Sequence, residues 1–334
     1  MVGLALLGAW HVHTKGFVEE ALNTGMAQLK VVWDDDQERG ISFAEEFGVP
    51  YEVDLNKVLA NPEVDAVIVE CATTKHKEVI IKAANAGKDI FSDKALALSV
   101  ADCLDIKNAV EENQVKFMVS LESKTIGAYR YAKQLVDEGK LGKVTSVYFR
   151  RVHQAAIDKD MLPAYWFNPT ETGGGVTLDL GCHGLYLLQH FCGTPKKVTS
   201  IMNELYGTGS DENSTTVIEF ANGAIGTAHT SFVAYQLDNM LEIIGTEGIL
   251  VISGAHNFRV LLQSKHVPGH ESLSPVENEL HPTDTELPSA QFVRLVASDN
   301  LQSLPDFDIN KAISLTRLIE CAYQSAKEQK TVLY

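Results

Sequence analysis

Five short apolar runs alternate with amphipathic stretches along the first 120 residues. The first run is continuously apolar and the others have an apolar centre, as in strands that are buried on both faces of a sheet. The stretches between them repeat apolar positions every three or four residues, which is typical of helices packed on a sheet. The predicted strands are 2–7, 29–33, 64–70, 88–92 and 115–119, and the predicted helices include 37–47, 55–59, 77–86 and 100–112. This order predicts an α/β fold over residues 1–120, a Rossmann domain with a doubly wound parallel sheet and a ligand at the carboxyl ends of its strands.

The pattern changes after Ser120, where a predicted helix over 126–138 leads into a strand-rich region. Turn signals such as Ala221-Asn222-Gly223 separate the later strands. The predicted strands are 145–152, 197–204, 215–220, 224–232, 240–244, 249–252 and 259–263, followed by a polar loop over 267–285 and helices over 290–297 and 309–327. We therefore expect residues 121–334 to form an α+β domain with a largely antiparallel open sheet. Helices cover one face, the other face is exposed or pairs with another subunit, and the C-terminal helix is a candidate to pack on the first domain.

The turn after the first strand reads Gly8-Ala9-Trp10-His11-Val12-His13. A strand, a tight turn and a helix in this order can place a pyrophosphate at the helix N-terminus. The dinucleotide fingerprint Gly-x-Gly-x-x-Gly keeps only its first glycine here, because Trp10 and His13 replace the other two. An ordinary strand-to-helix turn explains this segment equally well.

Three acids, Asp34-Asp35-Asp36, follow the second strand. An acid about 20 residues beyond the glycine turn is where a cofactor ribose is bound, and an acidic cluster would repel a 2′-phosphate. This favours NAD over NADP. The alternative is a solvated acidic turn that caps the helix over 37–47.

Three residues could carry proton chemistry. Lys94 directly follows the fourth strand, where a lysine can stabilise an alkoxide or relay a proton, or be a surface lysine in a loop. Asp179 and His183 follow the run Gly173-Gly174-Gly175 and lie four residues apart, which predicts one face of one helix. A carboxylate beside an imidazole favours a proton acceptor near neutral pH. The alternative is a helix-capping aspartate and a buried structural histidine.

Composition limits the remaining classes. The formal charge of −16 argues against binding nucleic acid or an anionic membrane. Apolar residues make up 45%, which is ordinary for a globular protein, and no run is long enough to span a bilayer. Five cysteines without a CxxC pair favour a reducing cytoplasm, and no usual metal-ligand spacing recurs, so we expect no metal.

Taken together, these motifs resemble the Gfo/Idh/MocA oxidoreductases, the family of glucose–fructose oxidoreductase and inositol dehydrogenase. The resemblance covers nearly the whole chain, from the glycine turn and Asp34 through Asp93-Lys94-Ala95 to the Gly173–His183 stretch and Gly245-Thr246-Glu247-Gly248. It implies catalytic roles for Lys94, Asp179 and His183. It implies cofactor contacts from Gly8, Ala9, Trp10, His11, Val12, Asp34, Cys71, Ala72, Thr73, His76, Asp93 and Lys94.

The chain departs from the family pattern at several of these positions. Asp93-Lys94-Ala95 replaces Glu-Lys-Pro, Cys71-Ala72 replaces Thr-Pro, and Tyr186 stands where many members have a second aspartate. Lys124 replaces a common arginine.

The resemblance implies NAD-dependent oxidation of a secondary ring hydroxyl of a sugar, inositol or glycoside. His183, held by Asp179, takes the hydroxyl proton, while Lys94 stabilises the developing charge on the same oxygen. The candidate substrate contacts are Lys124, His153, Tyr165 and Trp166, although the aromatic pair could equally be a packing plug. Two alternatives stay open, a redox-neutral NAD-dependent glycosidase and a non-catalytic NAD-binding regulator. A homo-oligomer formed through the C-terminal sheet is also implied.

Overall fold

The computed structural model describes residues 1–277, 282–298 and 304–334, and it divides into two compact units. The N-terminal unit comprises Met1–Glu122 and Glu286–Thr316, and the C-terminal unit comprises Ser123–Thr285 and Arg317–Tyr334. The chain first passes from the N-terminal to the C-terminal unit after Glu122, two residues beyond the predicted boundary at 120. The division differs from the prediction in that residues 286–316 return to the N-terminal unit, where α9 (Pro288–Ala297) packs against α1 (Thr14–Asn23).

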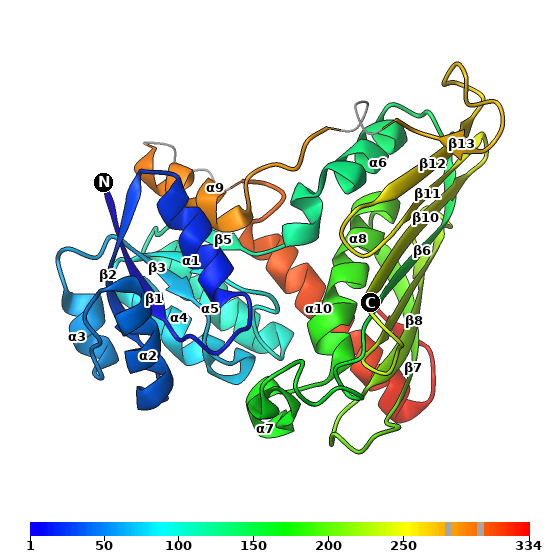
Figure 1. Cartoon of the computed structure of the whole chain (residues 1–334). Coiled ribbons are helices and arrows are strands. Elements are labelled where there is room, and N and C mark those ends of the chain that lie inside the picture. The colour runs from blue at the N-terminus through cyan, green and yellow to red at the C-terminus, as the bar shows by residue number, and fades with distance from the viewer. Residues whose placement is uncertain (278–281, 299–303) are drawn as a thin grey trace. The chain divides into compact units, whose positions relative to one another are not determined.

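The N-terminal unit contains a five-stranded parallel sheet in the order β2-β1-β3-β4-β5 (Figure 1). Its strands are β1 (Val2–Leu7), β2 (Ala27–Trp33), β3 (Ala66–Val69), β4 (Asp89–Ser92) and β5 (Phe117–Val119). The further helices are α2 (Gln37–Phe47), α3 (Leu55–Ala60), η1 (Thr73–Lys75), α4 (His76–Asn85) and α5 (Val100–Glu112). The sheet confirms the predicted parallel α/β fold.

The apolar runs form strands because both of their faces are covered. Every residue of β1 and of β3 is buried, as expected for strands between two helical layers. The strand order reverses direction between β1 and β3, and ligands of open parallel sheets bind at the carboxyl ends of strands beside such a reversal. The turns after β1 and β3 are therefore the first place to look for a site.

The C-terminal unit contains a nine-stranded sheet in the order β13-β12-β11-β10-β6-β9-β8-β7-β14. The strands are β6 (Val144–Val152), β7 (Pro195–Asn203), β8 (Asn213–Phe220), β9 (Ile225–Ser231), β10 (Asp238–Gly245), β11 (Gly248–Ser253), β12 (Arg259–Ser264), β13 (Ser274–Pro275) and β14 (Val332–Leu333). Among the described strands of this sheet only β6 and β9 pair in parallel, so the sheet is largely antiparallel, as predicted.

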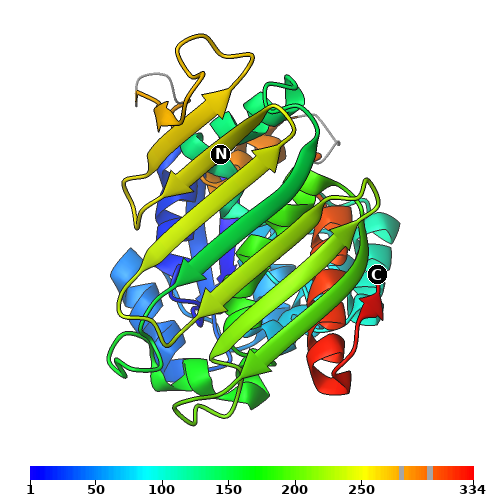
Figure 2. The ribbon, with the colours of Figure 1, turned by 90° about the vertical axis from the view of Figure 1, so that its right-hand side faces the viewer.

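Helices of the same unit lie against one face of this sheet. The helices and turns are α6 (Gly127–Asp137), η3 (Ala164–Phe167), α7 (Pro169–Thr172), η4 (Thr177–Gly181) and α8 (Cys182–Cys192). Helix α8 packs against β6 and β9, and buried residues alternate along the strands as a one-sided sheet requires. Figure 2 looks onto the opposite face, over which no helix of the described C-terminal unit lies.

Three details refine the sequence predictions. Helix α10 (Ile309–Glu328) runs from the N-terminal unit into the C-terminal one. The predicted loop over 267–285 contains the short strand β13, and its residues 278–281 lie outside the described part of the chain. Among the described helices, none is both long enough and apolar enough to cross a membrane.

Candidate active site

Gly8 forms the turn after β1. A glycine is required there because the backbone of this turn passes close to the backbone of Cys71. Its φ is +92°, and a Cβ at this position would lie 2.5 Å from the backbone N and Cα of Cys71. The amides of Trp10 and His11 both donate to the carbonyl oxygen of Glu70, at 3.1 and 3.3 Å. The turns after β1 and β3 are thus joined directly. Trp10 is buried in this arrangement, whereas Val12 is exposed.

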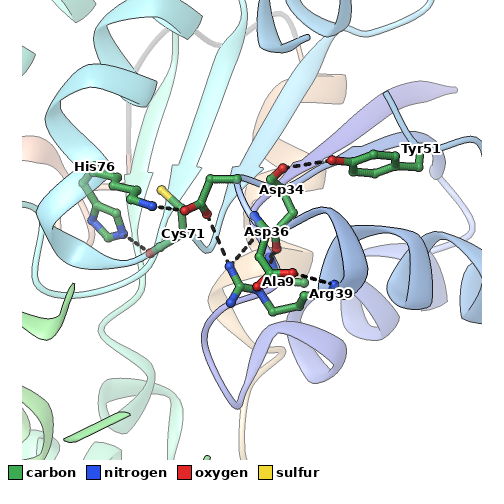
Figure 3. Close-up of polar contacts among 9 residues, drawn as sticks. Ala9, Asp34, Asp36, Arg39, Tyr51, Cys71 and His76 are labelled. Carbon is green, nitrogen blue, oxygen red and sulfur yellow. Dashed lines mark hydrogen bonds and ion pairs between the residues drawn. The ribbon is translucent and has the colours of Figure 1, made fainter. Parts of the chain in front are cut away.

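Asp34, at the end of β2, is a buried carboxylate that organises the neighbouring turn (Figure 3). Its Oδ2 accepts the amide N–H of Ala9 at 2.6 Å, and its Oδ1 accepts the amide of Asp36 at 2.8 Å. Arg39 donates to both oxygens, from Nε at 2.9 Å and from Nη2 at 2.6 Å. Tyr51 donates its hydroxyl to the backbone carbonyl of Asp34 at 3.1 Å.

The other two acids of this turn have separate roles. Asp36 caps α2, because its Oδ1 accepts the amide N–H of Arg39 at 3.0 Å. A helix cap was the alternative to cofactor binding that the sequence left open for the acids 34–36. The same contact lowers the pKa of the Asp36 carboxyl. Asp35 pairs with Lys75 and with Arg39. Two cations therefore stand among three acids at this edge of the sheet.

His76, at the start of α4, ties two loops together. Its Nε2 lies 3.0 Å from the carbonyl oxygen of Cys71, and its Nδ1 lies 3.1 Å from that of Ala95 and 3.2 Å from that of Leu96 (Figure 3 labels His76 and Cys71). Burial lowers the pKa of His76, and the three carbonyls oppose this shift. Ala72 and Thr73 start the turn η1 between Cys71 and His76.

The turns after β1, β3 and β4 bring His11, Glu70 and Asp93 together. One polar atom from each lies within 4.8 Å of the other two, and His11 Nε2 is 3.1 Å from Asp93 Oδ2. Burial and the neighbouring Lys94 lower the pKa of His11. Burial and the Asp93 carboxylate raise the pKa of Glu70, against an opposing effect of Lys94. The Lys94–Ala95 peptide bond is cis. Sequence reasoning did not single out Glu70, although an acid at the end of a buried strand was a usable signal.

Asp179 lies in the C-terminal unit with two other candidate residues. Trp166 donates its indole N–H to Asp179 Oδ2 at 3.3 Å. His153 is buried and stacks on Phe232 with 5.0 Å between ring centroids. Burial lowers the pKa of His153, while the charge of Asp179 raises it. The structure thus brings Asp179, Trp166 and His153 together. Tyr165 lies beside Trp166 in η3, and Lys124 lies in the turn η2 (Glu122–Thr125).

His183 is held at one ring nitrogen by two hydroxyl groups. Its Nδ1 lies 2.8 Å from the hydroxyl of Tyr186 and 3.1 Å from that of Ser123. The Tyr186 hydroxyl also accepts the amide N–H of Ser123 at 3.0 Å. Neither Ser123 nor Tyr186 was among the predicted site residues, although Tyr186 was noted at a position where many family members have an aspartate, three residues after His183.

The prediction that Asp179 and His183 share one regular α-helix is wrong. Asp179 lies in a π-helical turn, η4, and His183 lies in the first turn of α8. Asp211, which sequence analysis missed, accepts the amides of Gly175 at 3.0 Å and Thr177 at 2.7 Å at the start of η4. The glycine run permits this contact, because a Cβ on Gly175 would lie 2.1 Å from the carbonyl oxygen of Asp211. A wider turn redirects side chains, and such turns are frequent at functional sites.

Comparisons with known proteins agree with this architecture. Residues 1–121 match the model described as "Oxidoreductase family, NAD-binding Rossmann fold", and residues 129–251 match the GFO/IDH/MocA C-terminal domain. The scyllo-inositol 2-dehydrogenase (NAD(+)) of Bacillus subtilis is 28% identical over 84% of this chain and 81% of its own length. The 2,7-anhydro-N-acetylneuraminate hydratase of Escherichia coli is 30% identical over 71% of this chain and 65% of its own length.

A solved structure shares the whole fold. A levoglucosan dehydrogenase in complex with NADH and L-sorbose superposes with a TM-score of 0.88, covering 100% of this chain and 98% of that chain at 18% identity.

Proposed function

The chain belongs to the GFO/IDH/MocA oxidoreductase family, and from this premise we propose that it is an NAD-dependent dehydrogenase of sugars or cyclitols. The reaction is oxidation of a secondary ring hydroxyl to a ketone. Relatives named as dehydrogenases of scyllo-inositol, myo-inositol and levoglucosan support this substrate class. Within the structure, the observation that carries the proposal is the pair of hydroxyls at His183 Nδ1.

A dinucleotide fits the residues at the carboxyl edge of the N-terminal sheet. Gly8 lets the chain turn sharply beside β3, and the N-terminus of α1 that follows has no side-chain cap. Such a helix start offers amides to a phosphate. The nicotinamide ring of the bound cofactor supplies the hydride acceptor. The residues that would hold the cofactor are those of the Gly8 turn, the Asp34 turn and the segments around His76 and Lys94.

We propose NAD as the preferred cofactor, on the basis of the acids after β2. Asp35 and Asp36 stand beside the buried Asp34 and oppose a 2′-phosphate by charge. Arg39 is the counter-argument, since an arginine at this point can bind that phosphate. Arg39 donates two hydrogen bonds to Asp34, so a 2′-phosphate would have to compete with an existing bidentate ion pair. We therefore expect a higher kcat/KM with NAD than with NADP.

His183 serves as the proton acceptor in this proposal. A hydroxyl oxygen can accept a hydrogen bond and its hydrogen can donate one, so Nδ1 keeps a partner whichever tautomer the ring adopts. Nε2 can then gain and lose a proton without loss of the ring's orientation. Asp179 favours the charged form of the imidazole, and Lys94 stabilises the developing charge on the substrate oxygen.

A redox-neutral reaction is the second candidate, because two relatives are named as hydratases and not as dehydrogenases. Such an enzyme, or a redox-neutral NAD-dependent glycosidase, would oxidise its substrate only transiently and reduce it again before release. A screen of inositols, aldoses, anhydrosugars and simple glycosides with NAD and NADP separates the two. Accumulation of NADH with one ring polyol supports the dehydrogenase. Conversion of an anhydrosugar or glycoside without net NADH would support the redox-neutral enzyme instead.

We also propose that the chain self-associates through the open face of the C-terminal sheet. Ile201, Val217 and Ile225 project from neighbouring strands on this face and are 73%, 38% and 51% exposed. Exposed apolar side chains grouped on a flat sheet are typical of a protein interface.

A further inference from the structure

Glu70 is a buried carboxyl group that the proposed reaction does not use. It follows β3 directly, is 0% exposed, and has no hydrogen-bond partner at either oxygen among the described residues. The nearby Thr14 hydroxyl donates its hydrogen to the carbonyl of His11 at 2.6 Å, so it is not available to the carboxyl. An ionised carboxylate in such a place would lose its hydration and accept no hydrogen bond in return.

The neighbours of Glu70 increase this cost. Its carboxyl lies within 4.8 Å of the Asp93 carboxylate, and Glu122 adds a further negative charge nearby. Lys94 is the cation that faces the cluster, and His11 lies between the turns. Two carboxylates so close together repel each other, which raises the pKa of one of them so that it keeps its proton.

The orientation of His11 indicates which carboxyl is the anion. The amide of His13 donates to His11 Nδ1 at 3.2 Å, so this nitrogen is an acceptor and the ring hydrogen lies on Nε2. That Nε2 is 3.1 Å from Asp93 Oδ2, so the ring N–H side of His11 faces the Asp93 carboxylate at ion-pair distance. This ion-pair distance to the imidazole favours Asp93 as the anion of the two.

We propose that Glu70 is a carboxylic acid that stays protonated at neutral pH and shares its proton with Asp93, beside Lys94. Asp93 is then the single anion of the cluster, with the Glu70 proton beside it and His11 Nε2 at ion-pair distance, and Lys94 is the cation that faces it. Glu70 is a positioning residue, which fixes the charge around Lys94 without touching substrate. The neutral acid also adds no negative charge next to a cofactor pyrophosphate. This last consequence, and the role at Lys94, rest on the proposed function, whereas the protonation of Glu70 does not.

A metal ion is the rival occupant, since an imidazole and two carboxylates could form a ligand set. A metal bound at His11 Nε2 would need its hydrogen moved to Nδ1, where the His13 amide already donates. The His11 contacts therefore favour the proton over the metal.

The test uses the whole chain without cofactor or substrate, so it does not depend on the proposed function. Infrared spectra at pH 7 should show a carbonyl band of a protonated, buried carboxylic acid in the wild-type protein. The band should be absent from Glu70→Gln and retained in Glu63→Gln, a change at an exposed glutamate. Glu70→Gln is nearly isosteric and keeps a neutral donor, so it should fold.

Urea unfolding at a series of pH values supplies the second readout, because the protonation of Glu70 determines how the free energy of unfolding changes with pH. Glu70 is protonated in the folded chain and ionised in the unfolded chain above about pH 4.5, so folding becomes less favourable as pH rises. Relative to Glu70→Gln, the wild-type unfolding constant should rise about tenfold per pH unit over that window. A merely structural glutamate would not produce this slope. Absence of both the band and the slope would overturn the proposal, as would a stoichiometric metal in purified protein that Glu70→Gln releases.

Discussion

The sequence singled out His183 as a candidate residue but did not reveal which side chains surround it. The residue types Asp179 and His183 were visible in the sequence, and so was their spacing. The partners of His183 Nδ1 were not, because Ser123 is 60 residues away in the chain. Tyr186 stands where many family members have an aspartate, and here its hydroxyl contacts the histidine.

Removal of the His183 imidazole should abolish most of the proposed turnover. His183→Ala removes the proton acceptor, and general acid–base groups typically contribute about 10²- to 10⁴-fold to the rate. The measurement is kcat with the best substrate from the screen. His190→Ala, which changes a half-buried histidine at the end of α8, is the matched control and should retain activity. Near-full turnover in His183→Ala would exclude it as the base.

His153 should titrate below the ordinary histidine range. Burial lowers its pKa, and its Nδ1 accepts the amide of Ala155 at 3.2 Å, which only an unprotonated nitrogen can do. Because the folded state favours the neutral ring, this contribution to stability is complete above about pH 6.5 and is lost as pH falls. An NMR titration of labelled imidazoles, assigned with His153→Asn, checks the direction. A pKa at or above 6.5 would contradict this account.

At the scale of elements, regular strands were easier to predict than the segment that carries the candidate residues Asp179 and His183. Short apolar runs between amphipathic helices indicate parallel strands, since such strands are buried on both faces of the sheet. The π-helical turn η4 could not be foreseen, because its geometry depends on Asp211, which approaches from a loop 34 residues from Thr177. Periodicity alone predicted an ordinary helix there.

Asp211 should stabilise η4 strongly. Asp211→Ala removes the acceptor for the amides of Gly175 and Thr177 and for the Tyr323 hydroxyl, which lies 2.8 Å from Oδ1. Hydrogen bonds to a charged group, with buried donors left unpaired, suggest a loss of about 2–4 kcal/mol in the free energy of unfolding. Urea denaturation measures it, with exposed Asp160→Ala as the control. Equal stability of the two variants would show that the turn does not depend on Asp211.

At the scale of the whole molecule, the order of elements was predictable and the path of the chain was less so. The sequence indicated a change of architecture after residue 120, because the hydrophobic period changes there. It did not indicate that residues 286–316 rejoin the N-terminal unit. The apolar face of an amphipathic helix such as α9 shows that the helix packs on a core, but not on which of the two cores.

Self-association through the open sheet face predicts a specific response to charge. Val217→Lys places an ammonium among Ile201, Ile225 and their copies in a partner chain, so an oligomer formed there should dissociate. Sedimentation velocity should show an oligomer for the wild-type chain and a smaller species for the variant, with unchanged circular dichroism. Lys57→Glu in α3 of the N-terminal unit is the control for a change of surface charge. A wild-type monomer at micromolar concentration would contradict the proposed interface.

The most direct test of the central claim compares NADH formed with substrate consumed, for whichever polyol, sugar or glycoside the screen identifies. A dehydrogenase should accumulate one NADH and one ketone for each substrate molecule consumed, and Lys94→Met should lose both together. Consumption of substrate with no net NADH would contradict the dehydrogenase and establish a redox-neutral enzyme. Binding of NAD without turnover of any compound would contradict both and leave a non-catalytic NAD-binding protein.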